Sequence, residues 1–183
     1  MKIIPILLFA ASIASIQAAV VFNIWQSGSD VLSTGTGSIN TAGISKIGTT
    51  TFDPNVGPAD RSVIVGGQAS LDVYSRSFNF APFGNGSRTF ANTGTGNTFG
   101  FIGNNIYVPR NYVSDSQLAG TATYNSNTIA SLGMTPGTYT LTWGSGANAD
   151  SAQLIVGTAP IPEPSSLGLL ALGAFGLVAR RKR

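Results

Sequence analysis

Residues 137–143 read Gly-Thr-Tyr-Thr-Leu-Thr-Trp and alternate between polar and apolar side chains. In an extended chain, Tyr139, Leu141 and Trp143 fall on one side and the threonines on the other. A period of two is typical of a half-buried strand whose apolar face meets a core. The segment therefore predicts a strand in a layered β structure rather than part of a helix.

The same period recurs through the body of the chain, with Gly, Pro, Asn and Ser between the runs. Further strand candidates are residues 20–26, 30–35, 43–52, 62–67, 70–76, 98–103, 105–109, 118–124 and 152–157. Pro136-Gly137 predicts a type II turn, and residues 128–135 one helical turn. About ten short strands separated by turns predict an all-β fold, a β-sandwich or jelly roll. The low charge content would also suit a disordered stalk, but the recurring β-branched and aromatic residues favour a folded body.

The N-terminus has the pattern of an export signal. Lys2 is followed by an apolar run that ends in small residues around Ala18 and Ala19. A charged start, an apolar stretch and a small-residue exit are typical of a secretory signal peptide. We expect residues 1–18 to be the signal, with cleavage after Ala18 or Ala19. A buried N-terminal helix is the alternative, which Pro5 disfavours.

The charge of the chain is concentrated at its ends. The 183 residues carry 10 Lys and Arg against 7 Asp and Glu, a formal net charge of +3. Between residues 20 and 159 the balance reverses, because five basic residues face six aspartates. Nucleic-acid binding requires a basic surface on the folded domain. We therefore expect no nucleic-acid partner.

The composition also limits the chemistry. The chain contains no Cys and no His. Thiolate or imidazole zinc sites and His-activated nucleophiles are thereby excluded. We expect no catalytic residue, metal or cofactor, and a non-enzymatic body. The alternative is a hydrolase that uses two aspartates as acid and base. Its candidates are Asp30, Asp53, Asp60, Asp72, Asp115 and Asp150.

Two further features of the sequence resemble patterns found in ligand-binding proteins. Residues 144–149, Gly-Ser-Gly-Ala-Asn-Ala, fit a dinucleotide fingerprint, but a strand follows where that fingerprint needs a helix. This stretch therefore predicts a hairpin loop. A second alternative is a carbohydrate-binding module that stacks sugars on exposed aromatic rings, although core packing also explains those rings. The rings concerned are Trp25, Tyr74, Tyr107, Tyr112 and Trp143.

The C-terminus combines three elements in order: Pro162-Glu163-Pro164, an uncharged stretch at 165–179, and Arg180-Arg181-Lys182-Arg183. A helix of fifteen residues is about 22 Å long, short of the ~30 Å hydrocarbon core of a bilayer. Thinning of the bilayer and snorkelling arginines make insertion feasible. The basic residues would then mark the cytoplasmic side and act as a stop. A buried core helix is the alternative for this segment.

This tail resembles the PEP-CTERM sorting signal of Gram-negative bacteria, which also carries the label "ice-binding protein C-terminal domain". The resemblance implies recognition of Pro162, Glu163 and Pro164 by an exosortase, a membrane enzyme proposed to be a cysteine transpeptidase, with cleavage nearby. It also implies association with exopolysaccharide and biofilm. Residues 122–157 are similar to a body often found ahead of this signal, without an activity attached to it. Ice binding would need a flat, regular array of threonines, and the linear sequence shows none.

Three regions are therefore expected: a signal peptide at 1–18, a β-rich extracytoplasmic domain at 19–159, and a sorting signal at 160–183. The leading hypothesis is an exported protein of the cell surface or extracellular matrix. The C-terminal helix would hold it in the membrane transiently, before processing. The carbohydrate-binding module and the aspartate-dependent hydrolase stay open as alternatives.

Overall fold

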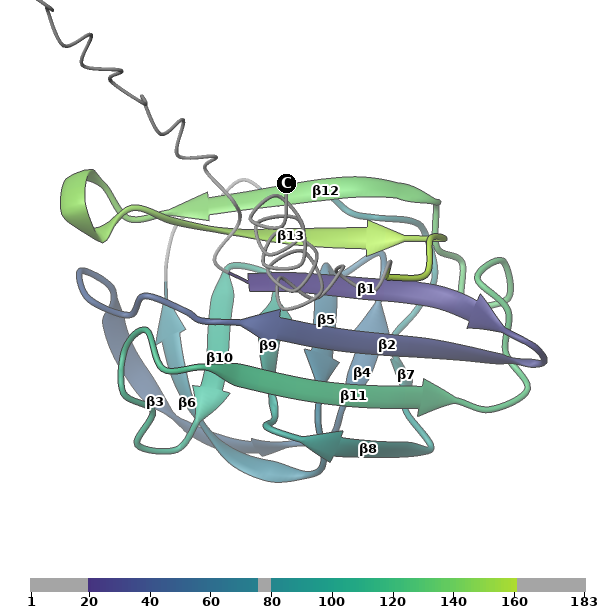
Figure 1. Ribbon diagram of the computed structural model, residues 1–183, viewed down its shortest axis with the longest axis horizontal. Helices are drawn as coiled ribbons and strands as arrows, with labels where there is room; N and C mark the ends of the chain where they lie inside the picture. The colour runs from purple at the N-terminus through teal and green to yellow at the C-terminus, as the bar shows by residue number, and fades with distance from the viewer. Residues whose placement is uncertain (1–19, 76–79, 161–183) are drawn as a thin grey trace, which may run out of the picture.

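The computed structural model describes residues 20–75 and 80–160. Figure 1 shows two β-sheets packed face to face, which confirms the predicted all-β, sandwich-like body. The predicted signal peptide, the C-terminal helix at 165–179 and the basic residues 180–183 lie outside the described residues.

The front sheet in Figure 1 has six strands in the order β12-β13-β1-β2-β11-β8. Their bounds are β1 Val20–Ser27, β2 Asp30–Gly37, β8 Thr93–Gly96, β11 Leu118–Tyr124, β12 Gly137–Trp143 and β13 Asp150–Val156. All neighbours pair antiparallel except β1 and β13, which run parallel with Val20 opposite Ala152. The first and last strands of the described body are therefore neighbours at the middle of one sheet.

The second sheet has seven strands in the order β3-β6-β10-β9-β5-β4-β7. Their bounds are β3 Ser45–Phe52, β4 Asn55–Gly57, β5 Ser62–Val65, β6 Ala69–Ser75, β7 Thr89–Phe90, β9 Phe99–Ile102 and β10 Asn105–Pro109. All its pairs are antiparallel, and β3 is interrupted by a bulge between Lys46 and Gly48.

The main core lies between the two sheets. In β12, Leu141 and Trp143 are buried while the three threonines of the strand are exposed, as the alternation predicts. The ring of Phe22 on β1 packs 5.4 Å from Phe99 and 5.6 Å from Phe101 on β9, measured between centroids. Residues from both sheets thus interdigitate in one apolar cluster.

A smaller core forms on the opposite side of the second sheet, around Ile64, Leu71, Val73 and Tyr107. β3 and β4 lie far apart in the order of this sheet, yet only Asp53 and Pro54 connect them. The sheet must therefore curl, so that the end of β3 crosses towards the far strands. The ring of Phe52 consequently lies 5.7 Å from that of Tyr107, and the Arg88 guanidinium lies 5.7 Å from the Phe52 ring.

All the predicted strand segments contain strands, and three short strands, β4, β7 and β8, were missed.

The expected helical turn is present, since Leu132 N–H donates to Thr128 O at 3.0 Å. Thr128 and Ser131 cap it reciprocally, each backbone N–H donating to the other's hydroxyl. The prediction of a type II turn at Pro136-Gly137 is wrong. Gly137 has a φ of 157° and begins β12, whereas the third residue of a type II turn requires a φ of about +80°.

Candidate functional site

The outward surface of the six-stranded sheet is rich in threonine. We call the following threonines, which face away from the core, the threonine face: Thr34 and Thr36 on β2, Thr93 and Thr95 on β8, Thr121 and Thr123 on β11, and Thr138, Thr140 and Thr142 on β12. Each of these four strands contributes a Thr-x-Thr segment whose threonines face the same way, because side chains two apart in a strand share a face.

The strand register aligns these segments into rows. Thr34 of β2 lies opposite Thr121 of β11, which in turn lies opposite Thr95 of β8. The hydroxyls of Thr95 and Thr121 are 2.9 Å apart, a hydrogen bond between strands. The linear sequence did not reveal this partial alignment, because it is assembled across strands that are distant in sequence. Neighbouring strands are rotated by about 20–25°, so the rows follow a twisted surface rather than the plane of a crystal lattice.

The remaining outward side chains of this sheet are also uncharged along most of its length. They are Val21, Asn23 and Trp25 on β1, Leu32 on β2, Ala119 on β11, and Ser151, Gln153 and Ile155 on β13. Asp30 shares this register at the hairpin end of β2, where its Oδ1 accepts a hydrogen bond from Ser126 N at 2.9 Å. Hydroxyls, amides and a half-buried indole, interspersed with four aliphatic side chains, therefore form a largely neutral surface.

The five aromatic rings that could have formed a sugar-stacking platform do not share one surface. Trp143 and Tyr107 are buried, one in each core, and contribute no open ring. Tyr112 is half-buried, and its hydroxyl donates to Ser116 O at 2.6 Å and accepts from Ile39 N at 3.0 Å. Tyr74 is half-buried on β6 of the other sheet and packs against the main core. Trp25 alone of the five belongs to the threonine-bearing surface.

Two aspartates have structural partners. Asp72 is buried and forms an ion pair with Lys46, with Nζ 2.7 Å from Oδ1, while its Oδ2 accepts from Asn111 N at 3.0 Å. Burial alone would raise its pKa, but Lys46 and the Asn111 N–H outweigh that effect and hold the pKa below its ordinary value. Asp60 pairs with Arg88. Both carboxylates thus hold loops and strands in place.

Asp150 is a further aspartate whose surroundings change its pKa. Burial raises the pKa of Asp150, hydrogen bonds lower it, and the charge of Asp115 adds a further rise. Its Oδ2 accepts from Asn40 N and its Oδ1 from Ser151 N, both at 2.7 Å. Through these bonds Asp150 holds the backbone at Asn40 next to the start of β13. Within residues 20–75 and 80–160, no group of three or more acidic, His or Cys side chains could hold a metal ion.

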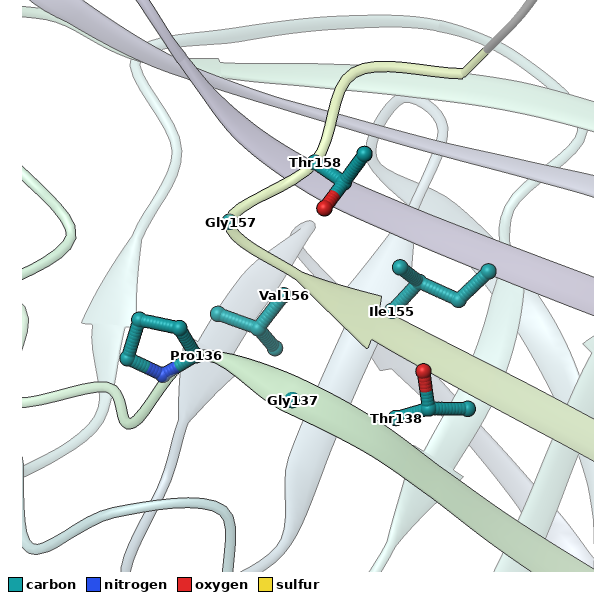
Figure 2. A pocket seen from close by; sticks show the side chains of 7 residues that line it. All are labelled: Pro136, Gly137, Thr138, Ile155, Val156, Gly157 and Thr158. Carbon is teal, nitrogen blue, oxygen red and sulfur yellow. The ribbon is translucent and has the colours of Figure 1, made fainter.

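A shallow pocket of about 360 Å³ lies where β12 begins and β13 ends, away from the loop that joins the two strands (Figure 2). Its lining residues are Pro136, Gly137, Thr138, Ile155, Val156, Gly157 and Thr158. None of them is titratable, so they offer no acid, base or nucleophile. Residues 144–149 form the hairpin loop at the other end, with a short 3₁₀ turn at Gly146–Asn148, and no nucleotide-binding helix follows.

The pocket also marks where the chain leaves the sheet. Gly157 N–H donates to Ile24 O at 2.8 Å, which extends the pairing with β1 by one residue. Five residues separate Val156 from Pro162 in the sequence. Pro162, Glu163, Pro164, Ala18 and Ala19 lie outside the described residues. No helix within the described ranges is long and apolar enough to cross a membrane.

These features define the body as a β-sandwich joined directly to a C-terminal sorting segment. Residues 160–183 match the family model of the PEP-CTERM protein-sorting motif, which confirms the sorting tail predicted from the sequence. The motif implies export towards the cell surface and processing by an exosortase. No curated protein and no solved structure matches the chain.

Proposed function

We propose that this chain is a cell-surface or extracellular-matrix protein whose β-sandwich is delivered by its C-terminal sorting signal and has no catalytic role. The match at residues 160–183, directly after the last strand of a folded domain, is the observation that carries the proposal. The signal peptide would direct export. The tail would then hold the protein in the membrane until an exosortase cleaves near Pro162-Glu163-Pro164.

The structural partners of the aspartates support a non-enzymatic body. Asp72 and Asp60 are paired with cations, and both carboxylate oxygens of Asp150 accept backbone hydrogen bonds. A general acid or base must reach a substrate proton, and these bonds compete with that task. The pocket in Figure 2 is lined by residues without a titratable side chain.

The intact mass of the protein extracted from the cell surface tests the sorting proposal. We expect the mass of a chain that begins at residue 19 or 20 and lacks the residues after the Pro-Glu-Pro region. Deletion of residues 162–183 should change surface retention while the circular dichroism of the body stays that of a β protein. Recovery of the full-length chain from the cytosol, or unchanged fractionation of the deletion, would contradict the proposal.

We also propose that the threonine face binds a neutral polysaccharide of the extracellular matrix. Sugars present hydroxyls that pair with hydroxyl and amide side chains, and they stack on an indole ring such as that of Trp25. The absence of charge along most of this surface suits an uncharged polymer better than an acidic one. This proposal is a form of the carbohydrate-binding alternative, in which Trp25 and the threonine face would bind the sugar.

Co-sedimentation with insoluble neutral and acidic polysaccharides tests this partner. We expect retention on a neutral polymer, weakened several-fold by Trp25→Ala. A matched control is Ile47→Ala, because Ile47 is an exposed apolar residue (58 %) on the β3 bulge of the other sheet. Equal binding by both variants would remove the threonine face from consideration, while leaving the sorting proposal intact.

A further inference from the structure

The two sheets have four edge strands: β12 and β8 in the six-stranded sheet, and β3 and β7 in the other. An edge strand presents backbone N–H and C=O groups that can pair with another chain. Folded proteins commonly protect such edges with charges, bulges, proline or short length. The four edges can therefore be compared by these criteria.

Three of the edges are protected. β3 carries Lys46 and a bulge at the next residue, which interrupts any regular ladder. β7 has two residues and follows the charged Arg88. β8 has four residues, two of them glycine, with Gly96 at a φ of +82°. None of these three offers a long, regular template for a further strand.

β12 has no such protection. All seven of its residues, Gly137–Trp143, pair in unbroken register with β13, and it contains no charge, proline or bulge. Figure 1 shows it as the outermost strand of the front sheet. Among the described residues, no backbone or side-chain group outside β13 hydrogen-bonds to the β12 backbone. Within residues 20–75 and 80–160, its outer row of N–H and C=O groups has no partner.

We propose that β12 pairs antiparallel with β12 of a second copy of this chain, which joins two six-stranded sheets into one continuous sheet. A two-fold axis at Thr140 places Thr140 opposite itself and Thr138 opposite Thr142. Directly opposed residues of antiparallel strands share a face, so the threonine faces of the two copies become contiguous.

The chemistry of the strand favours self-pairing over a charged partner. Pairing a charged edge with itself sets like charges opposite one another, and β12 has none. On the outer side threonine meets threonine, a pair that stabilises sheets. On the inner side Tyr139 meets Leu141 of the second copy, an aromatic–aliphatic contact. Closed two-fold pairing also uses up both β12 edges and leaves only the protected ones.

Cysteine cross-linking tests the contact and its register, because the chain contains no natural cysteine. Thr140→Cys places two thiols opposite one another at the axis, close enough for a disulfide or a short bis-maleimide bridge. We expect a cross-linked dimer of the exported protein at micromolar concentration. Thr138→Cys alone should cross-link poorly, whereas a mixture of Thr138→Cys and Thr142→Cys chains should form the bridge.

Thr36→Cys is the matched control, since Thr36 is an exposed threonine on the same face but in the interior strand β2. It should give no dimer. Independently, Thr140→Lys should weaken the dimer at least tenfold by sedimentation, while Thr36→Lys leaves it unchanged; circular dichroism checks that both variants are folded. A monomeric exported protein, absence of the Thr140→Cys bridge, or equal bridging at Thr36 would overturn the proposal. The first two results would also be expected if the chain's own tail covered β12.

Discussion

The indole Nε1 of Trp143 donates a hydrogen bond to the backbone oxygen of Asn40 at 2.9 Å, although the two residues are 103 positions apart. The backbone N–H of the same asparagine donates to Asp150 Oδ2 at 2.7 Å. The segment that leaves β2 is thus tied to both strands of the β12–β13 hairpin. Trp143 therefore fills space in the core, and its indole N–H also has a hydrogen-bond partner there.

Replacement of Trp143 tests this double role. Trp143→Phe removes the hydrogen bond and leaves unfilled volume, so we expect the free energy of unfolding to fall by about 2–3 kcal/mol. Trp25→Phe is the matched control on the outer face and should cost less than about 1 kcal/mol. Urea unfolding followed by circular dichroism measures both. Equal losses would show that the Asn40 contact contributes nothing.

Gly35 is required where β2 passes between aromatic rings. A Cβ built at this position would lie 2.8 Å from atoms of both Phe22 and Phe99. We expect Gly35→Ala to destabilise the body by about 1–3 kcal/mol through overpacking. Gly48→Ala on β3 is the control, because nothing lies within 4 Å of its added Cβ, and it should be neutral or stabilising. A thermal shift of the same sign for both would contradict the packing argument.

The ion pair between buried Asp72 and the exposed Lys46 side chain predicts a pH dependence of stability. The folded state holds the pKa of Asp72 below its ordinary value of 3.8, so the unfolded chain takes up its proton first as pH falls. The stabilisation is therefore complete above the unfolded-state pKa and is lost as pH drops through the folded-state pKa. Asp72→Asn should lower the free energy of unfolding by roughly 1–3 kcal/mol at pH 7.

The matching experiment compares melting temperatures of wild type and Asp72→Asn from pH 7 to pH 2. Their difference should shrink towards the acid end of the range. A difference that stays constant with pH would mean that lost packing, rather than lost charge, explains the effect.

Buried Tyr124 and half-buried Tyr139 should respond in opposite ways to loss of their hydroxyl. Tyr124 is fully buried, its hydroxyl lacks a well-formed hydrogen bond, and burial raises its pKa strongly. Tyr124→Phe should therefore be neutral or stabilising by up to about 1 kcal/mol. Tyr139 donates to Thr135 O at 2.9 Å, and Tyr139→Phe should cost about 1 kcal/mol. Denaturant titration of the two variants would refute this contrast if Tyr124→Phe proved the more harmful.

Local pattern was enough to predict much of the body. Alternation within β12 identified its inner side chains, and similar runs located most of the other strands. β4, β7 and β8 were missed because two to four residues rich in Gly, Asn and Thr show no clear period. The Pro136-Gly137 turn failed because pairing of Gly137 with Val156 holds the glycine in the sheet.

The candidate site was predictable only in part. The sorting tail was visible because Pro162-Glu163-Pro164, the apolar run and the basic end are contiguous, and the family match agrees. The Thr-x-Thr segments were also visible one by one. Their common surface was not, because it depends on which strands are neighbours.

The sequence by itself determined the all-β class, the side of β12 that meets the core, and the sorting segment at the C-terminus. Only the tertiary structure decided that β1 lies parallel to β13, that threonines from four strands share one surface, and that β12 is an unprotected edge. The reason is physical: a period of two depends on adjacent residues alone. Strand order and register depend on contacts between residues far apart in the chain, whose stability is decided by the packing of the whole core.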